Sequence, residues 1–272
     1  MSVTKKEIAS LVSDFSIEVT PASAERVEAF ADHLVPGTSI NVTFLPGSSF
    51  TDTIRVSKRI HEEGFKPIPH LAARNFESSK ALEQSLDKLT SYANVEEVLI
   101  IAGGLDSPLG PYHSTMQILG SGLLEKYSIK KIGIAGHPEG SPDISNSDID
   151  AALNDKNAWA RNTDIEVYIA TQFCFEASVI LDWEARIKKL GNTLPIHIGL
   201  PGLATLKTLL KFAKMSGIGP SMRVLTRQTK NLAKLVMTQE PDIVITDLTS
   251  VSYTHLRAHE TLRYLVCRLL LE

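Results

Sequence analysis

Short apolar segments rich in Val and Ile alternate along the chain with longer segments whose apolar residues recur at helical spacing. The short segments are continuously apolar and do not alternate between apolar and polar residues. This pattern is typical of parallel strands that helices cover on their outer face. It predicts strands at residues 15–20, 39–45, 66–72, 96–103, 131–136, 166–173, 195–201 and 242–248. The longer segments predict helices, which include residues 22–34, 78–92, 147–161, 176–191, 203–217 and 226–239.

Capping residues and apolar stripes support several of these helices. We expect the first one to open after Pro21, with Ser23 as its N-cap. Gly191 is the expected stop of the fourth. The second begins at a serine pair and carries three leucines on one face, Leu82, Leu86 and Leu89.

The eight predicted strands, each followed by a helical segment at a spacing of about 30 residues, predict an α/β fold of the (β/α)8 TIM-barrel class. A barrel of about 250 residues forms one domain, so we expect residues 1–249 to be a single domain. A doubly wound open sheet is the alternative. The absence of a G-x-G-x-x-G turn after the first strand weakens it.

The end of the chain differs in composition from the rest. The segment SYTHLRAHETLRYLVCRLLLE holds three Arg and two His, and no turn residues separate it from the eighth predicted strand. It resembles a translated sequencing adapter or vector read-through. We therefore interpret residues 250–272 as a non-native tail and expect a truncated or replaced C-terminal helix. The alternative is a native amphipathic helix whose apolar face is formed by Leu262, Leu265, Val266 and Leu269.

Composition narrows the class of protein. Hydrophobic residues make up 43% of the chain and the net charge is only −3, which excludes a mainly disordered chain and disfavours a nucleic-acid partner. No apolar stretch of about 18 residues occurs. The polar N-terminus is unlike a signal peptide, so we expect a soluble cytoplasmic protein without a membrane partner. The two cysteines and the spacing of the other ligand residues predict neither a disulfide framework nor a metal site.

Functional groups of a barrel lie at the carboxyl ends of its strands and in the loops that follow. Glu18 is the most informative candidate, because a carboxylate inside the apolar strand SIEV is costly unless it is partnered or functional. A desolvated carboxyl group can hold a proton near neutral pH and act as a general acid. The alternative is a structural glutamate in a salt bridge.

Other candidates lie at the ends of later strands. His70 could donate to a ligand phosphate or carbonyl, or could be a core histidine bonded to the backbone. Gln172 could bind a substrate with an amide-like edge, or could belong to a structural network. Gly103 and Gly104 permit close approach of a flat or phosphorylated ligand. No G-x-S-x-G motif occurs and Cys174 has no activating signature, which disfavours nucleophilic hydrolysis.

Seven motifs occur in collinear order over residues 14–219: SIEVTP, NVTFLPG, IPHLAAR, VEEVLIIAGG, IGIAGHPEGSPD, YIATQFCFEA and IHIGLPGLATLKTLLKFAKMSGI. Together they make the chain similar to the 5,10-methylenetetrahydrofolate reductase family. The resemblance implies a (β/α)8 barrel that binds FAD and reduces methylenetetrahydrofolate to 5-methyltetrahydrofolate with NADH or NADPH. This product supplies methyl transfer in one-carbon metabolism and methionine biosynthesis. The resemblance also implies a homo-oligomer.

The resemblance further implies roles for single residues. Glu18 matches the catalytic acid that protonates folate N10, and Gln172 matches a glutamine that contacts folate. Arg161 replaces a lysine and keeps positive charge for a phosphate. The positions matched to flavin binding are Thr43, His70, Gly103, Gly104, His137, Asn157 and Arg161.

Several positions depart from the family's pattern. Ala102, Gly103 and Gly104 stand where the family has Arg-Gly-Asp, so Asp106, two residues later, is the candidate replacement in substrate binding. His137 stands in place of a tyrosine. These changes leave two alternatives to a flavin-dependent reductase. One is direct hydride transfer from NAD(P)H to the folate, and the other is a non-catalytic folate- or flavin-binding accessory barrel.

Overall fold

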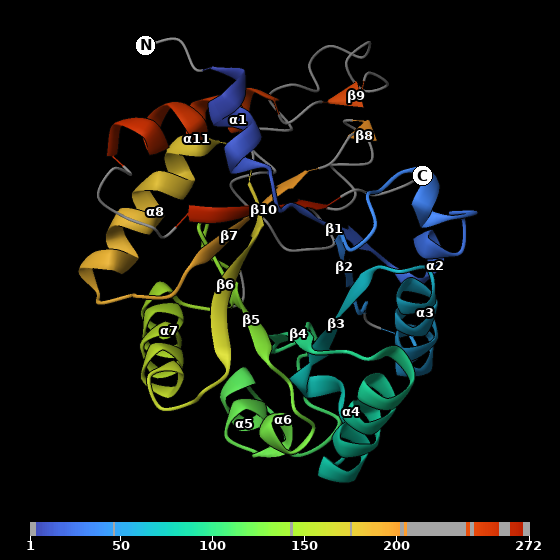
Figure 1. Cartoon of the computed structure of the whole chain (residues 1–272). Coiled ribbons are helices and arrows are strands. Elements are labelled where there is room, and N and C mark those ends of the chain that lie inside the picture. The colour runs from blue at the N-terminus through green and yellow to red at the C-terminus, as the bar shows by residue number, and fades with distance from the viewer. Residues whose placement is uncertain are drawn as a thin grey trace. The chain divides into compact units, whose positions relative to one another are not determined.

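The computed structural model describes residues 4–45, 47–141, 144–174, 176–201, 204–205, 238–239, 242–255 and 262–268. The chain divides into two compact units. We call residues 16–135 and 158–169 the β1–β5 unit, and residues 1–15, 136–157 and 170–270 the β7–β10 unit. Strand β6 (Glu166–Phe173) and helix α7 (Asn146–Ala160) contribute residues to both units, and Figure 1 labels the elements.

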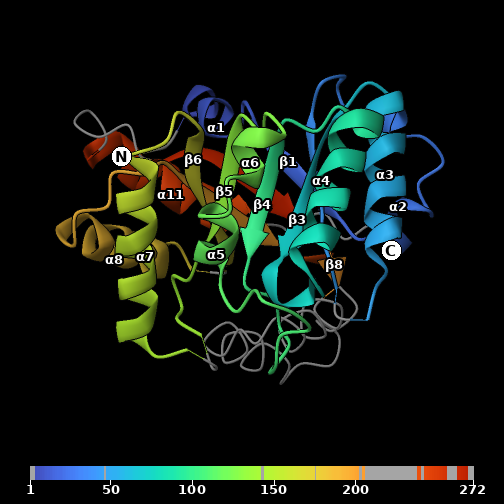
Figure 2. The ribbon, with the colours of Figure 1, turned by 90° about the horizontal axis from the view of Figure 1, so that it is seen from below.

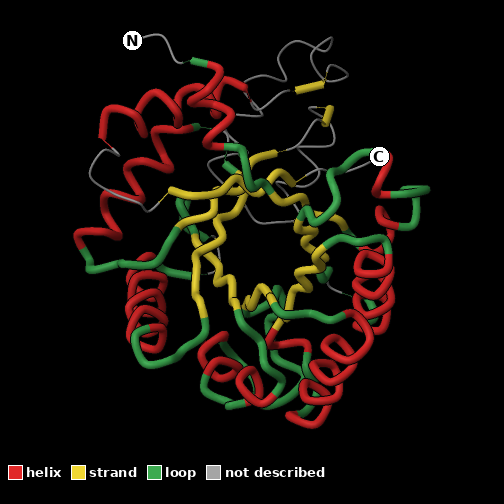
Figure 3. The backbone as a smooth tube through the Cα atoms, in the orientation of Figure 1, coloured by secondary structure: helices red, strands yellow, loops and turns green. Residues whose placement is uncertain are grey.

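Five parallel strands form the sheet of the β1–β5 unit: β1 (Ser16–Val19), β2 (Ser39–Val42), β3 (Lys66–Ala72), β4 (Glu97–Ile101) and β5 (Lys131–Gly136). Each pairs with the next along the chain. Figure 3 shows them as a curled sheet with helices on its outer side. Most of their residues are buried, which is why these strands read as continuous apolar segments. The predicted class is confirmed as α/β and TIM-barrel-like.

Short and long helices connect these strands: α2 (Pro21–Ala24), η1 (Phe30–Asp32), α3 (Phe50–Glu62), η2 (Ala73–Asn75), α4 (Ser79–Ala93), α5 (Thr115–Leu119) and α6 (Leu123–Lys126). Figure 2 shows α3 and α4 side by side. The prediction for α4 is confirmed. Ser78 caps its N-terminus by accepting a hydrogen bond from Ala81 N at 3.1 Å, and its three leucines are buried.

The predicted helix over 22–34 is wrong in its length, because it is divided into α2 and η1. Thr20, not Ser23, is the N-cap of α2, and Pro21 occupies its first turn. Arg59 of α3 accounts for the break. Its guanidinium donates to the carbonyl groups of Ala24, Val27 and Glu28 at 2.8, 2.7 and 3.0 Å. These are carbonyl groups that a continuous helix would use for its own hydrogen bonds.

The β7–β10 unit contains α1 (Lys5–Leu11), α8 (Ala177–Lys189), β7 (Ile196–Pro201), β8 (Ala204–Thr205), β9 (Thr238–Gln239), α11 (Asp242–His255) and β10 (Leu262–Arg268). Strand β10 runs parallel to β7, whereas β8 and β9 form an antiparallel pair. Gly191 follows the end of α8 with φ 92°, as its expected role as a stop requires. Across the described ranges, no helix is both long enough and apolar enough to cross a membrane.

The predicted strand at 242–248 is wrong, because these residues lie in α11. Val244 and Leu248 are buried at helical spacing, and a short apolar segment cannot be told from a buried helix by its pattern alone. The alternative of a helix over the last residues is also wrong where β10 lies. The helices predicted over 203–217 and 226–239 fall outside the described residues, apart from the strands β8 and β9. The interpretation of residues 250–272 as a non-native tail stays a prediction.

Polar side chains gather at the amino ends of strands in the β1–β5 unit. The Lys131 ammonium lies 3.8 Å from Glu97 Oε1, 3.7 Å from Glu166 Oε1 and 5.0 Å from the centre of the Tyr168 ring. Gly133 makes room for this ring, because a Cβ there would lie 2.8 Å from the Tyr168 hydroxyl oxygen. Burial raises the pKa of Glu97, and the positive charge of Lys131 opposes this shift.

The free energy of unfolding of the parent chain should decrease as the pH rises. We expect this decrease to be smaller in Glu97→Gln. The pKa of Glu97 is raised on folding, so its stabilising contribution is fully present below the ordinary glutamate pKa. That contribution is lost as the pH rises through the folded value. The free energy of unfolding of the parent chain, measured with denaturant from about pH 4 to about pH 7, should fall more steeply than that of the variant. Glu96→Gln, at an exposed neighbour, should keep the parent profile, and identical profiles for E97Q and the parent would contradict the prediction.

Candidate functional site

Three buried polar side chains, Glu18, Asn41 and His70, lie on one face of the β1–β5 sheet. The register places Glu18 of β1 opposite Asn41 of β2 and Asn41 opposite Ile68 of β3. His70 follows Ile68 by two residues and therefore points to the same side. Glu18 is only 8% exposed. The sheet thus brings the predicted acid and the predicted strand-three histidine to a common face.

Asn41 connects this group. Its Nδ2 donates to Ser16 Oγ at 3.1 Å and to the Ile17 carbonyl group at 3.3 Å, and its Oδ1 lies 3.4 Å from His70 Nε2. The amide therefore ties β1 to β3 through side chains. Sequence reasoning missed this connecting role, although Asn41 carries the same signal as Glu18, a polar residue within an apolar strand.

Thr43 follows the carboxyl end of β2. Its backbone N–H donates to the Val19 carbonyl group at 2.8 Å, which extends the pairing with β1 by one bond. Its hydroxyl oxygen is buried and has no hydrogen-bond partner within the described part of the chain. Leaving a buried hydroxyl group unpaired costs free energy. A ligand at this end of the strands could supply the missing partner.

Arg74 fixes the loop that follows β4. Its Nε donates to the His113 carbonyl group and its Nη1 to the Leu105 carbonyl group, both at 3.0 Å. Its own carbonyl group accepts a hydrogen bond from Leu109 N at 2.8 Å. This loop carries Gly103, Gly104 and Asp106, of which the last two are exposed. The carboxylate of Asp106 is therefore on the surface of this loop, and its role in substrate binding stays a prediction.

Gly103 is held close to β3. Its φ is +92°, and a Cβ there would lie 3.0 Å from Asn75 Oδ1 and 3.2 Å from Ala72 Cβ. The positive φ favours glycine at this position, and a Cβ would in addition make tight contacts with β3 and the turn after it.

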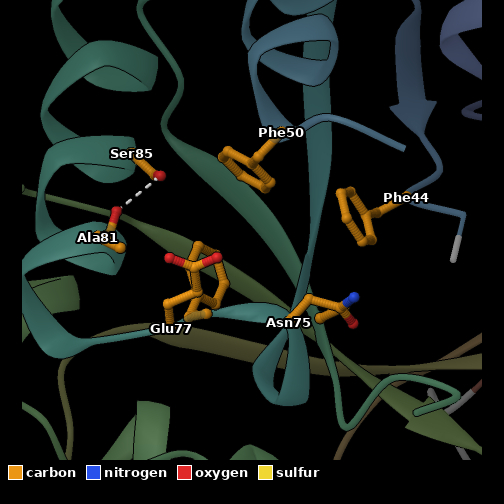
Figure 4. Close-up of a pocket in the computed structure, with 8 residues that line it drawn as sticks. Phe44, Phe50, Asn75, Glu77, Ala81 and Ser85 are labelled. Atoms are coloured by element: carbon orange, nitrogen blue, oxygen red, sulfur yellow. Dashed lines mark hydrogen bonds between the residues drawn. The ribbon is translucent and has the colours of Figure 1, made fainter. Parts of the chain in front are cut away.

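An aromatic pocket lies in the β1–β5 unit, next to the carboxyl ends of β2 and β3. Figure 4 shows the labelled Phe44, Phe50, Asn75 and Glu77 around it. The Phe44 and Phe50 ring centres are 5.9 Å apart, and the Phe50 and Phe76 centres are 5.3 Å apart. The cavity has a volume of about 150 Å³. It is large enough for one aromatic ring. These phenylalanines were not predicted, since single aromatic residues beside strand ends are common in cores.

Gln172 belongs to the β7–β10 unit, near the carboxyl end of β6. Its Oε1 is buried and has no hydrogen-bond partner among the residues that the structure describes. Thr171 fixes the backbone here, because its Oγ1 donates to the Gln172 carbonyl group and accepts from Gly199 N, both at 2.8 Å. A Cβ at Gly199 would lie 2.6 Å from the Thr171 carbonyl oxygen, so β6 and β7 approach closely only with glycine there. Gln172 is thus a rigidly placed amide with an unused acceptor.

Three further residues that were predicted to bind the flavin lie in or next to α7 and β5. Asn157 of α7 donates to Asn192 Oδ1 at 2.9 Å and accepts from Thr193 N at 3.1 Å, so its amide is engaged in hydrogen bonds within the protein. Arg161 is exposed, just beyond the end of α7. His137 follows β5, and burial together with the positive charge of Lys156 lowers its pKa to about 4. Its imidazole is therefore neutral at pH 7.

A comparison with known families identifies the chain's relatives. Residues 13–231 match the family model described as methylenetetrahydrofolate reductase. The chain belongs to the methylenetetrahydrofolate reductase family.

Solved structures bear on the fold. One similar structure is an uncharacterized protein from Clostridium thermocellum that binds two copies of 5-methyl-5,6,7,8-tetrahydrofolic acid. It is 14% identical, with a TM-score of 0.52 over 98% of this chain and 93% of that chain. Another is DHDPS from Cyanidioschyzon merolae with lysine bound, 12% identical, with a TM-score of 0.41 over 95% and 94% of the two chains. At this identity the first likeness agrees with the α/β fold alone.

Members of the methylenetetrahydrofolate reductase family typically use FAD and NAD(P)H. The residues at the carboxyl ends of β2 and β3 fit a flavin, since the buried Thr43 Oγ1 lacks a partner there. Thr43 and His70 are the residues of the β1–β5 unit that would hold it. The family's usual Arg-Gly-Asp is replaced by Ala102, Gly103 and Gly104, so the loop after β4 offers only backbone groups at these positions.

We expect Thr43→Val to raise the stability of the free chain and to weaken FAD binding. Valine has the shape of threonine and removes an unpaired buried hydroxyl group, which is worth about 1–3 kcal/mol. The same change removes the hydroxyl group that a flavin would engage. Thermal unfolding and FAD titration by fluorescence measure the two effects.

Thr53→Val is the matched control for this prediction. Thr53 Oγ1 is likewise buried and has no hydrogen-bond partner within the described ranges, but it lies in α3. This variant should gain stability and keep the parent affinity for FAD. Equal affinities in T43V and the parent would remove Thr43 from the flavin site.

Proposed function

We propose that this chain reduces 5,10-methylenetetrahydrofolate to 5-methyltetrahydrofolate, with NAD(P)H as the source of hydride. The observation that carries the proposal is the buried carboxyl group of Glu18, which lies in an apolar strand opposite Asn41. Membership of the methylenetetrahydrofolate reductase family supports the folate substrate. When bound, FAD would accept a hydride from NAD(P)H and pass it to the folate.

In this proposal Glu18 is the general acid. It donates its proton to N10 of the folate, and the bond between N10 and the bridging carbon breaks. The bridging carbon then forms an iminium ion with N5, and addition of a hydride to it gives the N5-methyl group. The substrate gains one proton and one hydride in total. The step requires a carboxyl group within hydrogen-bond reach of N10.

Two further residues have proposed roles in substrate binding. The unused Oε1 of Gln172 would accept a hydrogen bond from an N–H group of the folate ring, which would give this buried atom the partner it lacks. Asp106 would replace the family's aspartate from its exposed position on the loop that Arg74 holds.

In Glu18→Gln we expect the turnover of methylenetetrahydrofolate to fall by about 10²- to 10⁴-fold, the usual worth of a general acid. Glutamine keeps the size of the side chain but has no proton of suitable acidity to give. Folate-dependent oxidation of NADH measures turnover, and equilibrium dialysis with 5-methyltetrahydrofolate should show that binding persists. Glu97→Gln alters a buried carboxyl group at the amino ends of the strands and should keep parent turnover. Undiminished turnover in E18Q would assign the acid to another residue.

A non-catalytic folate-binding barrel is the second candidate function. It is favoured by Gly104, which stands where the family has an aspartate. The similar Clostridium thermocellum protein, described as binding 5-methyltetrahydrofolic acid, also supports it. Reductase chemistry without flavin, by direct transfer of hydride from NAD(P)H, is the remaining alternative.

The visible absorption spectrum of the purified, undialysed protein separates these functions. We expect a flavin band that bleaches on addition of NADH and recovers on addition of methylenetetrahydrofolate. A colourless protein that still turns over folate would replace the flavin route by direct hydride transfer. Folate binding without turnover would replace the reductase by the binding module.

A further inference from the structure

The aromatic pocket lies on the helix-covered side of the sheet, away from the face that carries Glu18. Thr43 continues the pairing of β2 with β1, so the side chain of the next residue, Phe44, points to the opposite face of the sheet. There the Phe44 ring lies 5.9 Å from the ring of Phe50, the first residue of α3. Residues of α4 complete the lining. None of the lining residues has a role in the proposed reduction.

Three phenylalanine rings line the pocket from different directions. The planes of Phe44 and Phe50 are inclined by 43°, and those of Phe50 and Phe76 by 61°. Inclined rings can surround a space, whereas parallel stacked rings would fill it. The volume of about 150 Å³ admits one compact group of the size of a benzene ring.

The loop after β4 holds the wall of the pocket that carries Phe76 and Glu77. Leu109 N of this loop donates to the Arg74 carbonyl group at 2.8 Å. Gly110 packs so closely on the wall that a Cβ there would lie 2.4 Å from the carbonyl oxygens of both Phe76 and Glu77. The pocket is therefore preformed in the free chain, which lowers the entropic cost of binding a ligand.

The polar groups around the pocket disfavour an anion as its occupant. Among the described residues that line it there is no lysine, arginine or histidine. The Ser85 hydroxyl group, which could donate to an anion, donates instead to the Ala81 carbonyl group at 2.8 Å, as Figure 4 shows. Glu77 adds a carboxylate to the lining. An anionic ligand would be repelled by this carboxylate and would meet no compensating positive charge.

Glu77 favours a cation over a neutral apolar group. Figure 4 shows this side chain across the pocket from the ring of Phe44. The Glu77 carboxylate is exposed and makes no ion pair or hydrogen bond within the described ranges, although Lys80 follows three residues later. Aromatic rings attract cations through the negative potential of their faces, most strongly where water is excluded. Aromatic rings and an unpaired carboxylate together suit a quaternary ammonium group.

We propose that the aromatic pocket binds a quaternary ammonium group, such as the trimethylammonium head of a choline-like molecule. The rings of Phe44, Phe50 and Phe76 surround the methyl groups, and Glu77 lies against the positive charge. A quaternary ammonium group has no N–H that requires a hydrogen-bond acceptor, so it suits walls made mostly of carbon. A primary ammonium group would lose hydration that these rings cannot replace. The site goes beyond the proposed function and requires neither folate nor flavin.

The test compares choline with 3,3-dimethylbutan-1-ol, in which a carbon atom replaces the charged nitrogen, on the full chain. The two molecules have the same shape, so the ratio of their affinities measures the effect of the charge. We expect choline to bind at least about threefold more tightly, and to raise the Tm relative to sodium chloride at the same ionic strength. NMR titration measures both affinities. Equal affinities would overturn the proposal, as would the absence of choline binding.

Two variants locate the site. Phe50→Leu keeps an apolar side chain without a ring, and should weaken choline binding by about three- to thirtyfold while the neutral alcohol still binds. Glu77→Gln keeps the size and removes the charge, and should weaken choline binding by about two- to fivefold, a difference that high salt removes. Asp87→Asn alters an exposed acid of α4 that does not line the pocket, and should behave as the parent. Parent affinity for choline in folded F50L, or equal losses in E77Q and D87N, would overturn the proposal.

The ratio of the two affinities also separates binding from a structural role. Glu77 precedes the N-cap of α4, where a negative charge stabilises the helix, so E77Q should lower the Tm of the free chain slightly whatever the pocket binds. A purely structural role leaves the affinity ratio unchanged in E77Q. Phe50→Tyr keeps the ring and should retain parent affinity for choline, so this variant and E77Q decide the question should F50L fold poorly. Binding of 5-methyltetrahydrofolate should be equal in the parent and all variants, and its failure in the parent would contradict the proposed function without touching this site.

Discussion

The register of β1 against β2 is the constraint on which the candidate site depends. It places Glu18 opposite Asn41, and the amide of Asn41 in turn reaches Ser16 and His70. A shift of one residue would turn Glu18 toward the opposite face of the sheet, where the helices pack. The pairing is fixed by the apolar residues between these polar ones, such as Ile17, Val19, Ile40 and Val42, which are fully buried. Packing of the core therefore also determines where the polar side chains of the candidate site lie.

The strands were predictable because the strands of a parallel sheet covered by helices are buried and therefore appear as continuous apolar segments in the sequence. The segments at 66–72, 131–136 and 166–173 became β3, β5 and β6 with the predicted bounds. Prediction failed where a side chain distant in the sequence determines the backbone conformation. Arg59 donates hydrogen bonds to the carbonyl groups after α2, and no residue within 22–34 indicates this. It failed again at 242–248, because a short apolar segment has the same pattern in a buried strand and in a buried helix, and these residues lie in α11.

The site was predictable only in part, for a related reason. Glu18, His70 and Thr43 are polar residues in or next to apolar strands, and that contrast is visible in the sequence. The loop-holding role of Arg74 was not visible, because its partners are backbone carbonyl groups of a segment about 30 residues later. The burial of Lys156 was missed because an amphipathic helix is expected to carry lysine on its outer face. Only the structure shows that this lysine lies on the inner one.

Polar groups are treated differently at the two ends of the β1–β5 strands, and this difference is an argument about function in itself. At the amino ends Glu97, Tyr168 and Lys131 compensate one another, as a structural cluster should. At the carboxyl end of β2 the Thr43 hydroxyl group is buried and finds no partner in the described part of the chain. In the β7–β10 unit, the buried Gln172 Oε1 likewise has no hydrogen-bond partner among the described residues. A chain selected for stability alone would replace such groups by apolar ones of the same shape. Their presence is explained if ligands supply the missing hydrogen-bond partners, so that groups which destabilise the free chain would recognise its substrate and cofactor.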